Sequence, residues 1–378
     1  MIYRFHLINV HPYFTKSFGS FLKDVDQFNE ELIEIKRNYN TDSELTPFLI
    51  LMDLMEGRVY DQELDEVLQR IRELTSVYQI QSCFLLDGDF EHLSKIQKQN
   101  DIIYSNYMVL STFYHTILST TQKVNKSWNH TSSKGLYLPG KLARPHRINL
   151  LAKLWKRGLL DKITYSCQIL SDEEEIIRSN FLKYDDETFA RFKMEVANLL
   201  DINFLEKPRF ESHGYPYDVN NYETTSFSII TESDFAVGLN GEVSWLPKLT
   251  EKTYRTIANK HPFIHCWYPG MVQRTERLGF KSFKEYLPFP NYNEIENLHE
   301  RINVTIENIK NFESIKNNFT TEIAKDVEHN FQKFLTLCRI EQTKLQPILS
   351  LPQTQDPGYH ITLRGFVHFM FPIPDFKP

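Results

Sequence analysis

Short apolar runs alternate with stretches of helical periodicity over the first 120 residues of the chain. Four apolar runs predict strands: residues 2–10, 48–54, 83–86 and 102–110. Between them, residues 21–37 and 60–78 carry apolar side chains at helical spacing. Strands that are separated by helices predict a parallel sheet covered by helices.

This pattern stops at residues 122–140, where the sequence is polar and rich in turn-forming residues, which predicts a linker between domains. A second α/β region follows. Its predicted strands are residues 163–166, 226–232 and 263–267, and its predicted helices are residues 148–159, 252–259 and 292–312, with more helix to about Cys338. The chain is therefore predicted to form two α/β domains, followed by C-terminal helices and a tail rich in proline and aromatic residues.

The composition is that of a folded globular protein, with 41% hydrophobic and 24% charged residues. These values exclude disordered and coiled-coil classes. The chain has only 13 glycines, and it contains neither G-x-G-x-x-G nor G-x-x-x-x-G-K-[ST]. Any phosphate binding would therefore depend on side chains or on helix N-termini rather than on a glycine-rich loop.

The net charge of −6, from 43 basic and 49 acidic residues, argues against a protein coated in positive charge for nucleic acid, but it leaves room for a local basic cleft. The cysteines form no C-x-x-C pair, which predicts reduced thiols rather than a disulfide or zinc framework. No signal-peptide pattern and no run of 18 apolar residues is present. We therefore expect a cytoplasmic protein without a membrane span.

Acidic residues are absent from residues 102–160, whereas basic residues are frequent there. Such a block raises the local potential and attracts anions, so it is either a solvated basic face of a helix or the lining of a phosphate-binding cleft. Arg144 and Arg147 stand out because they precede a predicted helix, and a guanidinium beside a helix N-terminus can bind a diphosphate. The basic residues are Lys123, Lys126, Lys134, Lys141, Arg144, Arg147, Lys153, Lys156 and Arg157.

A second cluster of candidates begins with Glu232, at the C-terminal end of a predicted strand, where open α/β sheets bind their ligands. Thr250 is predicted as the N-cap of the next helix, so that Glu251 and Lys252 fall in its first turn. A lysine there opposes the helix dipole unless an anion binds nearby, which makes Lys252 a candidate anion ligand. Two structural roles are the alternatives to ligand binding: Glu251 complements the helix dipole, and Glu232 and Lys252 form a surface ion pair.

The segment from SFSIITES to LTEKTYRTIANKHPFI resembles the donor-binding segment of GT-B glycosyltransferases, most of all the α1,3-fucosyltransferase type and related phage-encoded glycosyltransferases. In that family a strand that ends in glutamate precedes a helix that begins T-E-K. The upstream stretch LARPHRINLLAKLWKRGLLD resembles the arginine-bearing segment before the first helix of the donor domain, and LGFKSF is similar to phage members. The resemblance covers about residues 135–310.

The resemblance implies a GT-B fold, with two Rossmann-like domains whose parallel sheets face a central cleft, plus C-terminal helices. It divides the chain into an acceptor-side domain, a linker, a nucleotide-sugar domain, and C-terminal helices with a tail, at residues 1–125, 126–140, 141–310 and 311–378. It also implies transfer of a hexosyl or pentosyl group from a nucleotide sugar, a UDP- or GDP-sugar, to an acceptor hydroxyl. Neither a further cofactor nor a metal is expected.

Carried over to this sequence, Arg144 or Arg147 and Lys252 would neutralise the diphosphate, and Glu232 and Glu251 would contact sugar or ribose hydroxyls. Fixed cations there stabilise the negative charge that develops on the leaving nucleoside diphosphate. The predicted donor-binding residues are Arg144, Arg147, Glu232, Thr250, Glu251 and Lys252.

A catalytic base is expected from the first domain, because an inverting reaction needs a carboxylate to deprotonate the acceptor hydroxyl. The catalytic candidates at the ends of predicted strands are Asp53, Asp87 and Asp89, with Glu56 and His11 as further choices. Asp87 and Asp89 form an Asp-Gly-Asp sequence, which has two other interpretations: a tight turn, or a site that holds a divalent metal against a nucleotide diphosphate.

Two acceptors stay open: a saccharide or surface polymer, and a hydroxymethylated cytosine in double-stranded phage DNA, which would place the protein in the host cytoplasm. The basic block favours DNA, where phosphate contacts would position the duplex and the target base would be flipped out. The predicted acceptor or DNA contacts are Lys123, Lys126, Trp128, Lys134 and Lys141. A rival hypothesis is a non-catalytic nucleotide or nucleic-acid binding protein on a GT-B scaffold, which would keep the cations but lack a working base.

Overall fold

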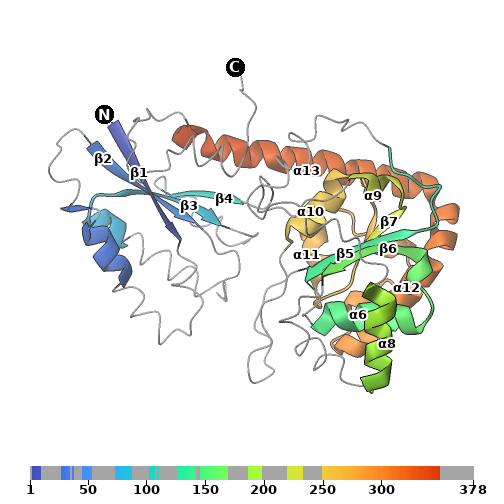
Figure 1. Ribbon diagram of the computed structural model, residues 1–378. Helices are drawn as coiled ribbons and strands as arrows, with labels where there is room; N and C mark the ends of the chain where they lie inside the picture. The colour runs from blue at the N-terminus through green and yellow to red at the C-terminus, as the bar shows by residue number, and fades with distance from the viewer. Residues whose placement is uncertain are drawn as a thin grey trace. The chain divides into compact units, whose positions relative to one another are not determined.

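The computed structural model divides into two compact units (Figure 1). Unit 1 comprises Met1–Ser119, Phe235–Leu246 and Thr336–Pro378, and unit 2 comprises Thr120–Asp234 and Pro247–Leu335. The structure describes residues 2–9, 27–34, 36–37, 45–52, 73–86, 102–106, 109, 127–141, 145–168, 186–197, 219–232 and 249–349.

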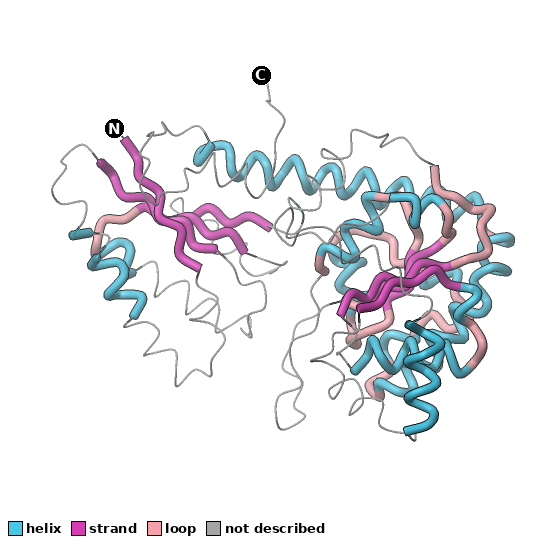
Figure 2. The backbone as a smooth tube through the Cα atoms, viewed as in Figure 1, coloured by secondary structure: helices cyan, strands magenta, loops and turns pink. Residues whose placement is uncertain are grey.

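Unit 1 contains a four-stranded parallel sheet (Figure 2). Its strands are β1 (Ile2–Asn9), β2 (Leu45–Met52), β3 (Gln81–Leu86) and β4 (Ile102–Asn106), paired in the order β1-β2-β3-β4. All four strands predicted for this part of the sequence are confirmed. The described strands follow one another across the sheet without a reversal of direction, so this sheet has no topological switch point among them.

Unit 2 contains a second four-stranded parallel sheet, with the order β6-β5-β7-β8. Its strands are β5 (Gly135–Lys141), β6 (Ile163–Gln168), β7 (Phe227–Ile230) and β8 (Phe263–His265). The chain moves from β5 outward to β6, and then returns to the other side of β5 to form β7 and β8. This reversal is Rossmann-like, and it places a switch point between β5 and β7.

Strand β5 corrects the prediction of a linker that extends to residue 140. Residues 135–141 form an inner strand of the second sheet and pair with both β6 and β7. The sequence GLYLPGK looked like a turn because it contains two glycines and a proline. Packing explains the glycine at the start of the strand: a Cβ atom on Gly135 would lie 2.5 Å from the Phe227 ring, so only glycine fits under this ring.

Helices cover both faces of the second sheet. In Figure 1, α6 (Pro145–Lys156) and α12 (Leu298–Asn318) lie on one face, and α10 (Glu251–Ala258) lies on the other. Opposite faces are expected, because right-handed crossovers that leave a switch point in opposite directions place their helices on opposite sides. Ile148, Leu150, Leu151 and Leu154 of α6 are buried, as expected for the apolar stripe of a helix that packs on a sheet.

Further helices pack on this frame. The α8 helix (Asp186–Ala197) lies against α6, where the rings of Trp155 and Phe192 are 5.4 Å apart. The α13 helix (Thr320–Leu349) lies against α10 through Phe334 and Tyr254, whose rings are 6.0 Å apart. The smaller elements are η2 (Leu160–Lys162), α9 (Val219–Glu223), α11 (Met271–Arg277), η5 (Lys284–Tyr286) and η6 (Tyr292–Glu294).

Two predicted helix boundaries are wrong. The helix predicted from residue 292 starts at Leu298, because the Asn297 side chain caps it by accepting a hydrogen bond from the Glu300 amide. The helix predicted from residue 148 starts at Pro145, a favoured first position because its fixed φ suits a helix. Arg147 therefore lies within the first turn of α6 rather than before it. No helix among the described residues has the length and apolar character that crossing a bilayer requires.

Candidate functional site

The strongest candidate site lies at the carboxyl edge of the second sheet, at the switch point between β5 and β7. Helix α6 begins four residues after β5 ends, and Glu232 follows the end of β7. The first turn of α10 meets the same edge, because its Thr250 amide donates a hydrogen bond to the Glu232 carboxylate over 3.0 Å. Open α/β sheets bind ligands in this position, and two helix N-termini add positive potential to it.

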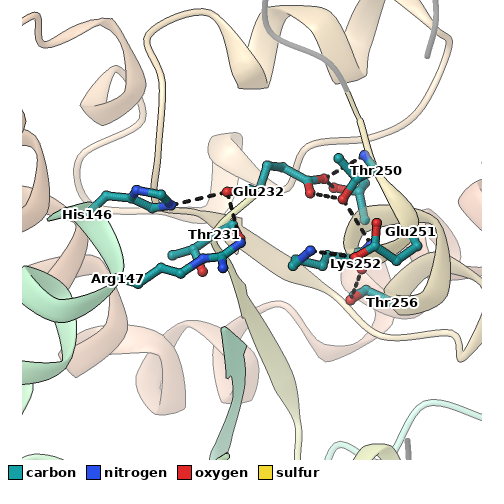
Figure 3. Close-up of polar contacts among 9 residues, drawn as sticks. His146, Arg147, Thr231, Glu232, Thr250, Glu251, Lys252 and Thr256 are labelled. Atoms are coloured by element: carbon teal, nitrogen blue, oxygen red, sulfur yellow. Dashed lines mark hydrogen bonds and ion pairs between the residues drawn. The ribbon is translucent and has the colours of Figure 1, made fainter. Parts of the chain in front are cut away.

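The α6 side of the site is attached to the end of β7. The Arg147 guanidinium donates through one nitrogen to the carbonyl oxygens of Thr231 and Glu232, over 3.4 and 3.3 Å. The His146 imidazole donates to the same Glu232 oxygen over 3.1 Å (Figure 3). Its ring lies 3.4 Å from the ring of half-buried Trp267. Both α6 side chains are buried, and the first turn of α6 contains no acidic residue.

The α10 side is organised by the Glu232 carboxylate, which is 1% exposed. This carboxylate accepts hydrogen bonds from the Thr250 amide, the Thr250 hydroxyl and the Thr253 hydroxyl. Burial raises the pKa of Glu232, although the charge of Lys252 opposes this shift. The sequence analysis did not identify Thr253 as a residue of the site. Its position three residues after the predicted N-cap was the signal for a hydrogen-bonding side chain there.

Lys252 forms its ion pair with Glu251, whose carboxylate oxygen lies 2.5 Å from the ammonium nitrogen. The alternative of a surface ion pair between Lys252 and Glu232 is therefore wrong, since Glu232 is buried. Burial on its own would raise the pKa of Glu251, but the charges of Lys252 and Arg255 outweigh burial and hold this pKa at about 2. Glu251 is thus ionised at neutral pH, and it lies in the first turn of α10, where a negative charge complements the helix dipole.

The strand β8 leads into the same edge through His265, Cys266 and Trp267. Burial lowers the pKa of His265 to about 3 and raises the pKa of Cys266 to about 12. Neither group can act as a nucleophile or a base near pH 7, since the imidazole stays neutral but inaccessible and the thiol stays protonated. The Trp267 carbonyl is held by the Arg301 side chain at 2.5 Å, which fixes the turn after β8.

Two residues of the basic block contact α12 within unit 2. The Lys153 ammonium donates to the His299 carbonyl over 3.0 Å and to the Asn303 side chain over 2.9 Å, both on α12. Arg157 forms an ion pair with Glu307 of α12 at 2.7 Å. These contacts hold α6 against α12. Lys153 is half-buried there, whereas Arg157 is exposed, so its ion pair lies on the surface and a solvated basic face stays open for it.

The described acceptor candidates do not gather at one place. Trp128 is 7% exposed and donates its indole N–H to the Ser226 carbonyl over 2.7 Å, so its contact with an acceptor stays a prediction that burial disfavours. Lys134 precedes β5 and therefore lies at the amino edge of the sheet, opposite the candidate site. Lys141 is the last residue of β5 and lies at the carboxyl edge.

Several predicted residues lie outside the described part of the chain. They are the catalytic candidates Asp53, Asp87, Asp89, Glu56 and His11, the donor candidate Arg144, and the acceptor candidates Lys123 and Lys126. Asp53 and Asp87 directly follow β2 and β3 in the sequence. Within the described ranges, no group of three or more His, Cys, Asp or Glu side chains is arranged to hold a metal ion.

The comparisons with known proteins do not assign the chain to a family. A scan against protein-family models found no matching family, and searches of curated proteins and of solved structures found no similar protein. The functional interpretation therefore rests on the sequence motifs and on the geometry of this site.

Proposed function

We propose that the protein is a nucleotide-sugar-dependent glycosyltransferase of the GT-B type, with the donor bound at the carboxyl edge of the second sheet. One observation carries the proposal: the first turns of α6 and α10, which bear Arg147 and Lys252, converge on the switch point between β5 and β7. A diphosphate at this edge would meet two helix N-termini and the ammonium of Lys252.

This chemistry fits glycosyl transfer. The leaving nucleoside diphosphate gains negative charge as the glycosidic bond breaks, so fixed positive groups stabilise the transition state more than the bound donor. Lys252 is the cation we place on the diphosphate. Arg147 already donates to two carbonyl oxygens, so Arg144 is the other arginine that the sequence offers for this role. Glu251, ionised beside Lys252, is the candidate for a sugar or ribose hydroxyl.

In the proposed GT-B fold, unit 1 is the acceptor-side domain. A saccharide or surface polymer is the first acceptor to be assayed, because Trp128, a predicted DNA contact, is buried. Double-stranded DNA with hydroxymethylated cytosine is the second acceptor to be assayed.

The first experiment is a thermal-shift screen with UDP, GDP, CMP, dTDP and ADP, with and without magnesium. A ligand that binds only the folded protein stabilises it by about 2.7 kcal/mol at a hundred times its Kd. We expect a shift with UDP or GDP that does not depend on magnesium. The absence of a shift with all five nucleotides would contradict the proposal, and binding without turnover of any nucleotide sugar would favour the non-catalytic binding protein.

The residue-level experiment is Lys252→Ala. Loss of a charged hydrogen bond should weaken binding of the nucleoside diphosphate by about 1.5–3 kcal/mol, which is roughly 10- to 100-fold in Kd. Isothermal titration calorimetry measures this change. Lys325→Ala on the exposed face of α13 is the matched control and should leave Kd unchanged. Equal affinities for the wild type and Lys252→Ala would remove Lys252 from the diphosphate site.

A further inference from the structure

Glu232 connects the two halves of the candidate site through different atoms. Its main-chain oxygen accepts hydrogen bonds from His146 and Arg147, which belong to the first turn of α6. Its side-chain carboxylate accepts hydrogen bonds from Thr250 and Thr253, at the start of α10 (Figure 3). A single residue at the end of β7 thus holds both helix N-termini in place.

The carboxylate is also linked to the main chain of Lys252. The Lys252 amide donates to the Thr250 hydroxyl oxygen over 3.3 Å, and the Thr250 hydroxyl donates in turn to Glu232. A chain of hydrogen bonds therefore runs from the first turn of α10 to the end of β7. Such chains orient their members jointly, because each hydrogen bond polarises the next.

Direct contact between Glu232 and a ligand is disfavoured by the same geometry. The residue is 1% exposed, and its two carboxylate oxygens already accept three hydrogen bonds from the protein. A sugar hydroxyl would have to reach a buried atom and compete with these donors. Breaking the network would leave a buried amide and two hydroxyls without an acceptor, which is costly.

We propose that Glu232 is a positioning residue rather than a ligand of the sugar. Its carboxylate fixes the first turn of α10, and thereby the place of Lys252, relative to the end of β7 and the first turn of α6. This inference rests on the proposed function, because the ligand that Lys252 would bind is the donor diphosphate. It differs from the role that the family resemblance implies for Glu232, which is contact with a sugar or ribose hydroxyl.

A double-mutant cycle separates the two roles. Affinity for GDP and UDP is measured by calorimetry for the wild type, Glu232→Gln, Lys252→Ala and the double variant. If Glu232 acts through Lys252, Glu232→Gln weakens binding by about three- to tenfold in the wild type and by less than about twofold in the Lys252→Ala background. An equal loss in both backgrounds would show that Glu232 does not act through Lys252, as in a direct contact with the ribose, and would overturn the proposal.

Thr253→Val provides a second test, because Thr253 is fully buried and cannot touch a ligand. This variant removes one donor to the Glu232 carboxylate at nearly constant volume. We expect it to weaken GDP or UDP binding in the same direction as Glu232→Gln, and to have little further effect when Glu232→Gln is already present. Wild-type affinity in a folded Thr253→Val protein would contradict a positioning network.

Hydrogen exchange in the free protein tests the network without any ligand. The reporters are the amides of Thr250 and Lys252, which donate to the Glu232 carboxylate and the Thr250 hydroxyl. In Glu232→Gln their exchange should become about tenfold faster, whereas exchange in α12 should not change. Unchanged exchange at α10 overturns the positioning role. If the wild type binds neither GDP nor UDP, the proposed function fails, and this exchange measurement still decides the role of Glu232.

Discussion

At the scale of single residues, the Phe227 ring imposes a steric constraint on Gly135. This ring is stacked on Phe312 at 4.1 Å and covers the start of β5. Gly135→Ala would place a methyl group 2.5 Å from a ring carbon, so the ring must move out of its stack. We expect a loss of about 1–3 kcal/mol in unfolding free energy, measured by denaturant titration.

Two comparisons test this explanation. Gly158 has a φ of +64°, and no atom lies within 4 Å of the position that a Cβ atom would take there, so Gly158→Ala should carry only the cost of left-handed backbone, about 1–2 kcal/mol. Phe227→Leu should be less destabilising in the Gly135→Ala background than in the wild type, because the smaller side chain relieves the clash. If the losses of unfolding free energy from Gly135→Ala and Phe227→Leu are additive in the double variant, a clash with the ring is not the cause of the Gly135→Ala effect.

Two buried histidines predict acid sensitivity of unit 2. His261 is held between the Ser228 hydroxyl at 2.7 Å and the Thr225 carbonyl at 2.9 Å, and burial lowers its pKa from 6.5 to about 4. His265 is likewise lowered, to about 3. Because protonation favours the unfolded chain, their contribution to stability is complete above about pH 6.5. It is lost as the pH falls to about 4 for His261 and to about 3 for His265.

The test compares unfolding free energies of the wild type and His261→Gln between pH 7 and pH 4. The wild type should lose up to about 3 kcal/mol more than the variant over this range, because the variant lacks one depressed imidazole pKa. Parallel pH curves for the two proteins would show that His261 is not the titrating group.

At the scale of elements, the pairing of α6 with α12 gives the clearest prediction. Lys153→Met removes the ammonium group, which donates hydrogen bonds to the His299 carbonyl and to the Asn303 side chain. Loss of two charged hydrogen bonds at a half-buried position should destabilise the protein by about 1–2 kcal/mol. Lys162→Met, at an exposed position of η2, is the control and should stay within about 0.5 kcal/mol of the wild type.

The same variant separates packing from nucleic-acid binding. If Lys153 holds α6 against α12, Lys153→Met lowers stability and leaves the retention of modified DNA in a filter-binding assay unchanged. If Lys153 instead contacts DNA phosphates, the variant keeps its stability and loses affinity with a reduced salt dependence.

The sequence predicted the elements whose pattern is local. The four strands of the first sheet and strands β6, β7 and β8 stand out as apolar runs, and α10 is marked by its cap at Thr250. Strand β5 could not be predicted in this way. Its glycines and proline are turn formers by propensity, and the reason for Gly135 is an aromatic ring that comes from a strand 92 residues later in the chain.

The candidate site shows the same division between local and distant information. Thr250 was correctly predicted as the N-cap, and Glu251 and Lys252 as the first helical turn, because an N-cap is read within a few residues. The hydrogen-bond partners of the Glu232 carboxylate were not predicted. Thr250 and Thr253, which donate to it, lie 18 and 21 residues later in the sequence. The ring contact between His146 and Trp267 joins residues that are still farther apart in the sequence, and it has no sequence signal.

At the scale of the whole molecule, the two sheets differ in strand order, and this difference suggests different roles. The second sheet has a switch point, with Glu232 and Lys252 beside it, which suits the binding of a diphosphate. The described strands of the first sheet run in the order of the sequence. In the proposed mechanism the first sheet contributes the catalytic base, from residues that follow β2 and β3.

The base and the donor site should therefore be separable by mutation. Among Asp53→Asn, Asp87→Asn and Asp89→Asn, we expect one to lower turnover by about 10²- to 10⁴-fold, because proton abstraction from the acceptor hydroxyl is lost. Its Kd for the nucleoside diphosphate should equal that of the wild type, in contrast to Lys252→Ala, which should raise Kd. Turnover is measured with the donor that the nucleotide screen identifies, and Kd by calorimetry. If all three variants keep wild-type turnover, these three carboxylates are excluded as the base, and Glu56 and His11 are the next to be changed.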